Sequence, residues 1–255
     1  MGTDVGDYDG DGLMDLVVTN FESETHSLFR NLGRGLFADA TFESGVGPVT
    51  LPFLGFGVAF FDYDNDADLD LAIANGHVLD NTSLFRSTSR YAQRNLLLRN
   101  DGKGRFAEVG RQSGAGWALE KVSRTLATGD IDNDGDLDVL VSNNGQPPDL
   151  LRNNGASASG NALLVRLRGR QSNRDGIGAR VTATIGSRRL VREVRAGSSY
   201  LGQNDVRLHF GLGRAAMVER LEIRWPSGQV EVLKGVASQQ VVTVAEGVGI
   251  VDPLP

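Results

Sequence analysis

The sequence contains no cysteine among its 255 residues. This absence excludes disulfide bridges, thiol catalysis and thiolate metal sites, but it leaves secretion open, because a β protein braced by calcium needs no disulfide. No apolar run approaches the roughly 20 residues of a membrane-spanning helix. The first residues, Met1 to Val5, have neither the basic start nor the apolar core of a signal peptide. The sequence also lacks a Gly-x-Ser-x-Gly elbow, a paired histidine metal motif and a phosphate-binding loop.

Charge is divided unevenly along the chain. Residues 1–155 contain 24 Asp and Glu against 12 Lys and Arg, a net charge of −12, whereas residues 156–255 contain 8 against 14, a net charge of +6. The acidic first part disfavours a phosphate backbone, and the basic second part lacks the interleaved aromatic residues of a single-strand nucleic-acid platform. We therefore expect no nucleic-acid partner.

Three nine-residue segments, 7–15, 62–70 and 130–138, carry Asp at positions 1, 3, 5 and 9. Carboxylates crowded into one turn repel each other unless they share protons or recruit a cation. Calcium takes about 6 to 8 oxygen ligands, which these side chains and the carbonyl of position 7 could supply. An acidic solvated turn is the plainer alternative, but three turns in register favour up to three Ca²⁺ sites. The predicted metal ligands are Asp7, Asp9, Asp11, Leu13, Asp15, Asp62, Asp64, Asp66, Asp68, Asp70, Asp130, Asp132, Asp134, Asp136 and Asp138.

The calcium loop that lies between two helices is excluded, because it requires a Glu at its twelfth position. The twelfth residues here are Val18, Ile73 and Val141, and each belongs to an apolar run typical of a buried strand. We therefore expect each metal site in a turn between two strands.

The second segment departs from the other two at its sixth position. Ala67 stands where the other segments have Gly12 and Gly135. If this position requires a positive φ, alanine is strained there, and the second site is expected to be distorted or weaker.

Repetition extends beyond these segments. Strand-like stretches precede them at 1–6, 55–61 and 123–129. A second signature, Leu-x-Arg-Asn followed by a glycine-rich turn, occurs at 28–37 and 97–106, and its first half recurs at 150–155. Each repeat thus predicts about four strands, which is typical of a β-propeller blade.

The second repeat carries an insertion of about 14 residues, at roughly His77 to Gln93, which includes Arg86, Arg90 and Tyr91. A long loop on a rigid scaffold could bind a partner or could be a decoration without function. His77 could be a ligand or an acid/base group, but a lone histidine more often makes a local hydrogen bond.

The second part, from about residue 160, has strand patterns at 163–168, 179–184, 190–194, 218–224, 229–233 and 240–244. These predict a small antiparallel sandwich of seven or eight strands, joined to the first part by a linker at 156–159. Five arginines could form one sheet face, either simply solvated or docked on the acidic first part or an acidic glycan. They are Arg166, Arg168, Arg180, Arg192 and Arg195.

These motifs resemble a known family. The aspartate-rich segments and their flanking strands are similar to FG-GAP/VCBS repeats, the calcium-loop blades of integrin-α-like propellers. Residues 74–78, 94–100, 172–181, 197–201 and 208–213 resemble proteins of the cartilage-acidic-protein type, in which an ASPIC/UnbV domain follows the propeller. The resemblance implies calcium sites at the aspartates above and implies no catalytic residues.

The resulting expectation is an all-β chain: FG-GAP/VCBS repeats at 1–155 (two blades and a partial third), an ASPIC/UnbV-type domain at 160–246 and a tail at 247–255. Since a closed propeller of this kind needs about seven blades, Met1 is expected to be an internal residue of a longer protein. The open blade edges would favour self-association.

Two functions remain open. One is a calcium-stabilised, non-enzymatic binding or adhesion module with a protein or glycan ligand, located outside the cell, in the periplasm or at the cell surface. The other is an accessory or catalytic protein of an enediyne-like biosynthetic pathway, suggested by the UnbV name.

Overall fold

The computed structural model describes residues 1–84, 89–155 and 160–251. The first part contains β1 (Thr3–Gly6), β2 (Asp15–Val18), β3 (Ser27–Gly33), β4 (Leu36–Asp39), β5 (Gly55–Phe61), β6 (Asp70–Asn75), β7 (Gln93–Arg94), β8 (Leu96–Asn100), β9 (Phe106–Glu108), β10 (Glu120–Lys121), β11 (Ser123–Gly129), β12 (Asp138–Asn143) and β13 (Gln146–Leu151). It also contains the helix α1 (Val46–Thr50) and the 3-10 turns η1 (Thr82–Leu84) and η2 (Ala115–Ala118). The second part contains β14 (Asn161–Arg168), β15 (Arg180–Ile185), β16 (Arg188–Glu193), β17 (Leu208–Gly213), β18 (Met217–Arg224), β19 (Val230–Ala237), β20 (Gln240–Ala245) and β21 (Gly249–Val251). Within the described ranges no helix has the length and apolarity to cross a membrane.

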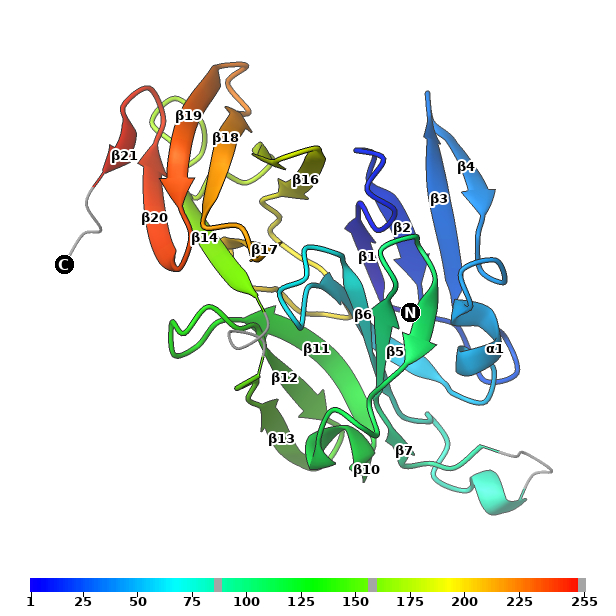
Figure 1. The fold of residues 1–255 in the computed structure, drawn as a ribbon. Helices are drawn as coiled ribbons and strands as arrows, with labels where there is room; N and C mark the ends of the chain where they lie inside the picture. The colour runs from blue at the N-terminus through cyan, green and yellow to red at the C-terminus, as the bar shows by residue number, and fades with distance from the viewer. Residues whose placement is uncertain (85–88, 156–159, 252–255) are drawn as a thin grey trace.

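Three antiparallel meanders form the first part: β1-β2-β3-β4, β5-β6-β8-β9 and β11-β12-β13. They stand as successive blades with β5 beside both β1 and β11, so the first strand of each meander is innermost (Figure 1). This close approach requires glycine in β5, because a Cβ on Gly57 would lie 2.5 Å from the nitrogen of Leu126. The predicted strands at 55–61 and 123–129 are confirmed with these bounds, as is the partial propeller.

The blades pack face to face through two apolar cores, and β5 contributes to both. Val58 and Phe60 point into the core shared with the first blade, whereas Ala59 and Phe61 point into the core shared with the third. All seven residues of β5 and all six of β6 are buried. Because both faces of these strands are buried, their sequences are continuous apolar runs and do not alternate between apolar and polar residues.

The second part is a sandwich of two four-stranded sheets, ordered β17-β14-β20-β21 and β16-β15-β18-β19. Side chains from both sheets, such as Leu163 and Val244 from one and Val181 and Leu221 from the other, form a single core. Two expectations are corrected here. The sandwich is not purely antiparallel, because β14 and β20 pair in parallel, and the expected tail contains β21, which pairs with β20. The expected linker, 156–159, lies outside the described residues.

A segment between β16 and β17, residues 197–205, inserts among the inner strands of the three blades; we call it the inserted segment (Figure 1, yellow trace). Ser199 exchanges two backbone hydrogen bonds with Thr3 of β1, at 3.1 and 2.9 Å. Its hydroxyl oxygen accepts hydrogen bonds from the backbone N–H groups of Val58 in β5 and Leu126 in β11, at 3.1 and 3.3 Å. One buried serine therefore joins all three blades to the second domain.

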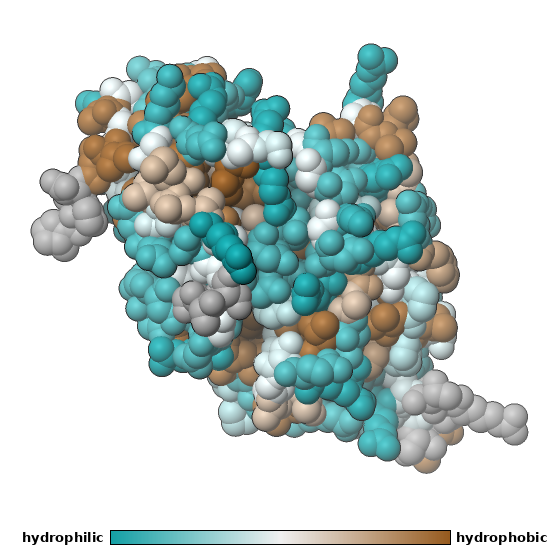
Figure 2. Space-filling view, in the orientation of Figure 1, coloured by the Kyte–Doolittle hydropathy of each residue, from teal (hydrophilic) through white to brown (hydrophobic). Residues whose placement is uncertain are grey.

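The surface is mostly hydrophilic, with separate apolar groups over β3–β4 and over β19–β21 (Figure 2). The group on β3–β4 consists of Leu32, Leu36 and Phe37, which are 53%, 63% and 49% exposed. These side chains lie on the outer strands of the first blade, where they form an exposed apolar group.

Candidate metal centres

Each aspartate-rich segment connects the first and second strands of its blade. The three loops join β1 to β2, β5 to β6 and β11 to β12, and the position-9 aspartates, Asp15, Asp70 and Asp138, begin the second strands. The predicted placement in a turn between two strands is therefore confirmed for all three loops.

The loops share one backbone conformation. Positions 4 and 6 both have positive φ in each loop: Gly10 (74°), Gly12 (89°), Asn65 (58°), Ala67 (77°), Asn133 (60°) and Gly135 (92°). The turn that results brings the N–H of position 6 to the position-1 carboxylate, at 3.1 Å in the first loop, 2.9 Å in the second and 3.0 Å in the third. Position 6 does require a positive φ, so Ala67 adopts a conformation that strains an alanine.

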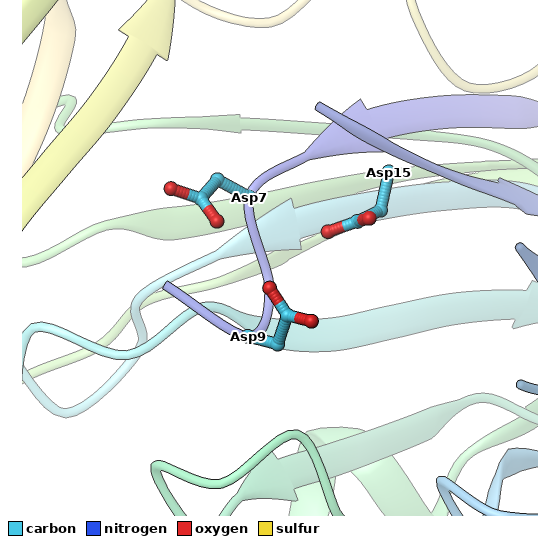
Figure 3. A group of neighbouring side chains, drawn as sticks. All are labelled: Asp7, Asp9 and Asp15. Atoms are coloured by element: carbon cyan, nitrogen blue, oxygen red, sulfur yellow. The ribbon is translucent and has the colours of Figure 1, made fainter. Parts of the chain in front are cut away.

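Three carboxylates converge in each loop, with one oxygen from each within 4.8 Å of the others. The converging groups are Asp7, Asp9 and Asp15 (Figure 3); Asp62, Asp64 and Asp66; and Asp130, Asp132 and Asp138. Nine of the predicted ligands are thus brought together. Asp11, Asp70 and Asp134 lie outside these groups, and the second loop differs from the others because position 5 replaces position 9.

The position-7 residues were predicted to bind through their carbonyls, and their side chains are engaged elsewhere. Asp68 forms an ion pair with Arg188, and the Asp136 carboxylate accepts a hydrogen bond from the side-chain amide of Asn65 at 3.1 Å. Leu13 has no polar side-chain atom to offer.

Burial raises the pKa values of several loop carboxylates above the ordinary range. Desolvation raises the pKa of Asp7 to about 6 and that of Asp15 to about 7, although backbone N–H groups act in the opposite direction. Desolvation, reinforced by the nearby Asp66, raises the pKa of Asp62 to about 8. The pKa of Asp70 is also raised well above normal by burial and by Asp62. The loops therefore favour either protons or a cation at these oxygens.

Two buried carboxylate oxygens, Oδ1 of Asp7 and Oδ1 of Asp64, have no hydrogen-bond donor among the described residues. Buried polar atoms are normally satisfied, so their state calls for an electropositive partner. The donor set consists of oxygen alone, which suits a hard divalent cation such as Ca²⁺. The residues present fit that ion.

The repeated Leu-x-Arg-Asn signature braces the loops, a role that its sequence did not reveal. The backbone N–H of its asparagine donates to the position-9 carboxylate at 2.8 Å in all three blades, and its side-chain amide donates to the carbonyl of position 8. These asparagines are Asn31, Asn100 and Asn153. The sequence signal for this role was that the asparagine recurs at the same place in each repeat.

Two of these asparagines also tie a loop to the next blade. The amide of Asn100 in the second blade donates to the Tyr8 carbonyl of the first loop at 2.8 Å. The amide of Asn153 in the third blade donates to the Tyr63 carbonyl of the second loop at 2.7 Å. The three loops therefore form one hydrogen-bonded series along the arc.

The insertion of the second blade begins with the buried His77, whose Nε2 lies 3.5 Å from the Glu22 carboxylate. His77 is 2% exposed, and its Nδ1 accepts a hydrogen bond from the backbone N–H of Leu79 at 2.9 Å, as expected for a local structural role. Arg90 is exposed and lies 3.7 Å from Glu120. Arg86 lies outside the described residues.

The five arginines of the second part do not form one sheet face. Arg166 and Arg168 belong to β14, whereas Arg180 and Arg192 belong to the other sheet. Docking on the acidic first part is nevertheless observed for two of them. Arg195 pairs with the buried Asp4 at 2.6 Å, and Arg180 donates to the carbonyl of Gly12 in the first loop.

Two family profiles match separate parts of the chain. The profile for FG-GAP-like repeats matches residues 7–73 and 84–141, which include the three loops. The profile for ASPIC and UnbV matches residues 169–251.

Cartilage acidic protein 1 of Mus musculus is 30% identical over 259 residues, a match that covers 96% of this chain and 36% of that protein. The Homo sapiens protein of the same name is 29% identical, covering 96% of this chain and 35% of its own length. The chain thus spans about a third of the length of these relatives. A solved Agrocybe aegerita structure is 18% identical, covers 61% of this chain and 40% of its own, and has a TM-score of 0.29, too low to support an argument. The chain belongs to the family that joins FG-GAP-like repeats to an ASPIC and UnbV domain.

Proposed function

We propose that this chain is a calcium-braced, non-enzymatic binding module of an extracellular protein, with one Ca²⁺ in each of the three loops. The observation that carries the proposal is the repeated geometry. Three loops from separate parts of the sequence have the same left-handed positions, the same hydrogen bond to position 1 and three converging carboxylates. An acidic turn that merely faces water has no reason to bury and converge its carboxylates three times over.

The proposed ligands are the aspartates of positions 1, 3, 5 and 9 and the carbonyls of Leu13, Asp68 and Asp136. Calcium in these loops would neutralise carboxylates that the fold buries, and its role would be structural. Because the aspartates are engaged in this way, none remains in the loops for acid–base catalysis. The name of the matched relatives supports an extracellular location, and the apolar group on β3–β4 supports a partner surface.

Titration of Ca²⁺ into chelator-treated protein, with Mg²⁺ as competitor, tests the metal sites. A ligand that binds only the folded form stabilises it by RT ln(1+[L]/Kd), about 2.7 kcal/mol per site at a hundredfold excess over Kd. We expect up to three sites and a rise of several degrees in the thermal midpoint. Light scattering during the titration reports whether the chain also self-associates.

The matched variants are Asp132→Asn in the third loop and Asp175→Asn, an exposed aspartate outside the loops. Asp132→Asn should remove one site, and Asp175→Asn should bind as the parent does. An unchanged thermal midpoint on calcium addition would refute the proposal. Loss of turnover of a biosynthetic substrate with unchanged stability in Asp132→Asn would instead favour a catalytic role.

A further inference from the structure

The second domain contacts the same atom in each of the three loops, the carbonyl oxygen of position 6. Arg180, at the start of β15, donates to the Gly12 carbonyl of the first loop. Arg188, at the start of β16, donates to the Ala67 carbonyl of the second loop at 3.0 Å. His209, in β17, lies with its Nε2 3.1 Å from the Gly135 carbonyl of the third loop, and the carbonyl can only accept, so this nitrogen carries the proton.

Further contacts strengthen the hold on the second and third loops. Arg188 also donates to the Asp66 carbonyl at 3.1 Å and pairs with the Asp68 carboxylate. The N–H of Gly213 donates to the Asn65 carbonyl at 2.8 Å. Arg207 donates to the carbonyl of Asp130 and to the side chain of Asn133.

Position 6 is hydrogen-bonded on both sides in each loop. Its N–H faces the position-1 carboxylate, and its carbonyl faces the second domain, so this residue is held from both sides. The next residue, position 7, supplies the proposed carbonyl ligand. A donor that holds the position-6 carbonyl therefore also holds the left-handed turn. This turn orients both the position-1 carboxylate and the position-7 carbonyl.

The packing of Ala67 adds an independent contact between loop and domain. Ala67 is 5% exposed, and its side chain belongs to the apolar core of the sandwich, together with Leu163 and Phe210. The methyl group that strains the second loop is thus buried by the second domain. Detachment of the domain would remove this burial and leave the strain.

We propose that the second domain holds the three loops in their metal-binding conformation, a role that we call a clasp. Arg180, Arg188 and His209 act as positioning residues that hold the loops in the metal-binding conformation, and calcium binding in turn tightens the contact between the two domains. This inference rests on the proposed calcium sites. Linkage requires the effect to be reciprocal, because a clasp that raises calcium affinity must itself be stabilised by calcium.

The test compares the full chain with Arg180→Ala/Arg188→Ala and with Arg189→Ala. Arg189 is exposed, adjacent to Arg188 and forms no described hydrogen bond to a loop, which makes it the matched control. In calcium titrations we expect at least about tenfold weaker binding at two of the three sites in the double variant, corresponding to the loss of at least one charge-assisted hydrogen bond per loop. Arg189→Ala should bind within twofold of the parent, and Arg188→Lys should recover part of the loss at the second loop.

Hydrogen exchange supplies the readout in the other direction. Calcium should slow exchange of the Gly213 amide in the parent, because that N–H donates across the domain contact, and the slowing should shrink in the double variant. Circular dichroism confirms that each variant is folded. If the double variant binds calcium as tightly as the parent, or if exchange at Gly213 ignores calcium, the clasp is refuted while the metal sites stand. If the parent binds no calcium, the proposed function itself fails.

Discussion

Glu246 is the most heavily hydrogen-bonded carboxylate of the second domain. Its Oε2 accepts from the backbone N–H groups of Arg170, Gln171 and Ser172 at 2.7, 2.8 and 2.7 Å. Its Oε1 accepts from the hydroxyls of Ser172 and Ser227. Burial by itself would raise the pKa of this carboxyl, but these donors outweigh it and lower the pKa to about 2.

Glu246→Gln should therefore destabilise the second domain. The amide keeps the shape of the side chain but removes its charge and replaces one of its two acceptor oxygens with a donor, so the charge-assisted hydrogen bonds are lost at a cost of about 2 kcal/mol in the free energy of unfolding. Urea unfolding at pH 7 measures the loss, with exposed Glu219→Gln as the control.

The stability lost in Glu246→Gln should be largest near neutral pH and smaller in acid. A folded-state pKa below the unfolded value contributes stability that is present above about pH 4.3 and declines as pH falls toward 2. The difference between the parent and Glu246→Gln should shrink over the same range. A difference that stays constant from pH 7 to pH 3 would contradict the assignment.

Ala67 shows how far one residue could be understood from the sequence. The positive φ followed from the glycines at the equivalent positions, and it is observed at 77°. The burial of the methyl group in the sandwich core could not be foreseen, because its neighbours lie about 100 residues away in the sequence. Whether the second site is weaker remains a prediction that the calcium titration tests.

At the level of single elements, the inserted segment depends on Ser199. Ser199→Ala removes the acceptor for two backbone N–H groups, those of Val58 and Leu126, while leaving the bonds to Thr3 in place. A buried donor without an acceptor costs about 1 to 3 kcal/mol. We expect the free energy of unfolding to fall by about 3 kcal/mol in chemical denaturation.

The neighbouring serine is the matched control. The hydroxyl of Ser198 is buried and has no hydrogen-bond partner among the described residues, so Ser198→Ala removes no bond. Its free energy of unfolding should be equal to or slightly above that of the parent. Equal losses in the two variants would show that Ser199 does not join the blades.

Elements were predictable where the pattern was local. The strands beside each loop followed from apolar runs at fixed distances from the aspartates, and six strands of the sandwich followed from alternation. The parallel pairing of β14 with β20, strand β21 and the inserted segment were missed. The parallel pairing and the inserted segment depend on contacts between residues far apart in sequence, which a local pattern does not encode. Strand β21 is a three-residue strand that forms a hairpin with β20, and it was missed because so short a segment carries little pattern.

For the whole molecule, the opposite charges of the two parts correspond to contacts between them. The acidic surplus lies in the loops, and arginines of the basic part contact those loops or the neighbouring β1: Arg180, Arg188, Arg195 and Arg207. The sequence indicated the aspartates of the loops and the possibility of docking. It could not show that the cations bind mainly to loop carbonyls, because side-chain charge does not reveal which backbone groups the fold presents.

The buried carboxylates make the stability of the metal-free chain depend on pH. Folded-state pKa values of about 6, 7 and 8 for Asp7, Asp15 and Asp62 exceed the unfolded value of about 3.9. Their contribution to stability is fully present below that unfolded value and is lost as pH rises through 6 to 8. Burial lowers the pKa of His26 and His209 to about 4, which opposes this trend, since neutral histidine is favoured as pH rises. The destabilising effect of the three carboxylates exceeds the stabilising effect of the two histidines, because the summed pKa shifts of the carboxylates between pH 5 and pH 8 are larger.

We therefore expect the thermal midpoint of the chelated protein to fall by several degrees between pH 5 and pH 8, since 1 kcal/mol moves the midpoint by about 2 to 4 °C in a chain of this size. Calcium binds only the ionised carboxylates, so its stabilising effect should grow over the same range. Calorimetry at both pH values, with chelator or with saturating Ca²⁺ at constant ionic strength, measures both changes. A chelated protein that becomes more stable from pH 5 to pH 8 would show that its loops hold no carboxylates in need of a cation.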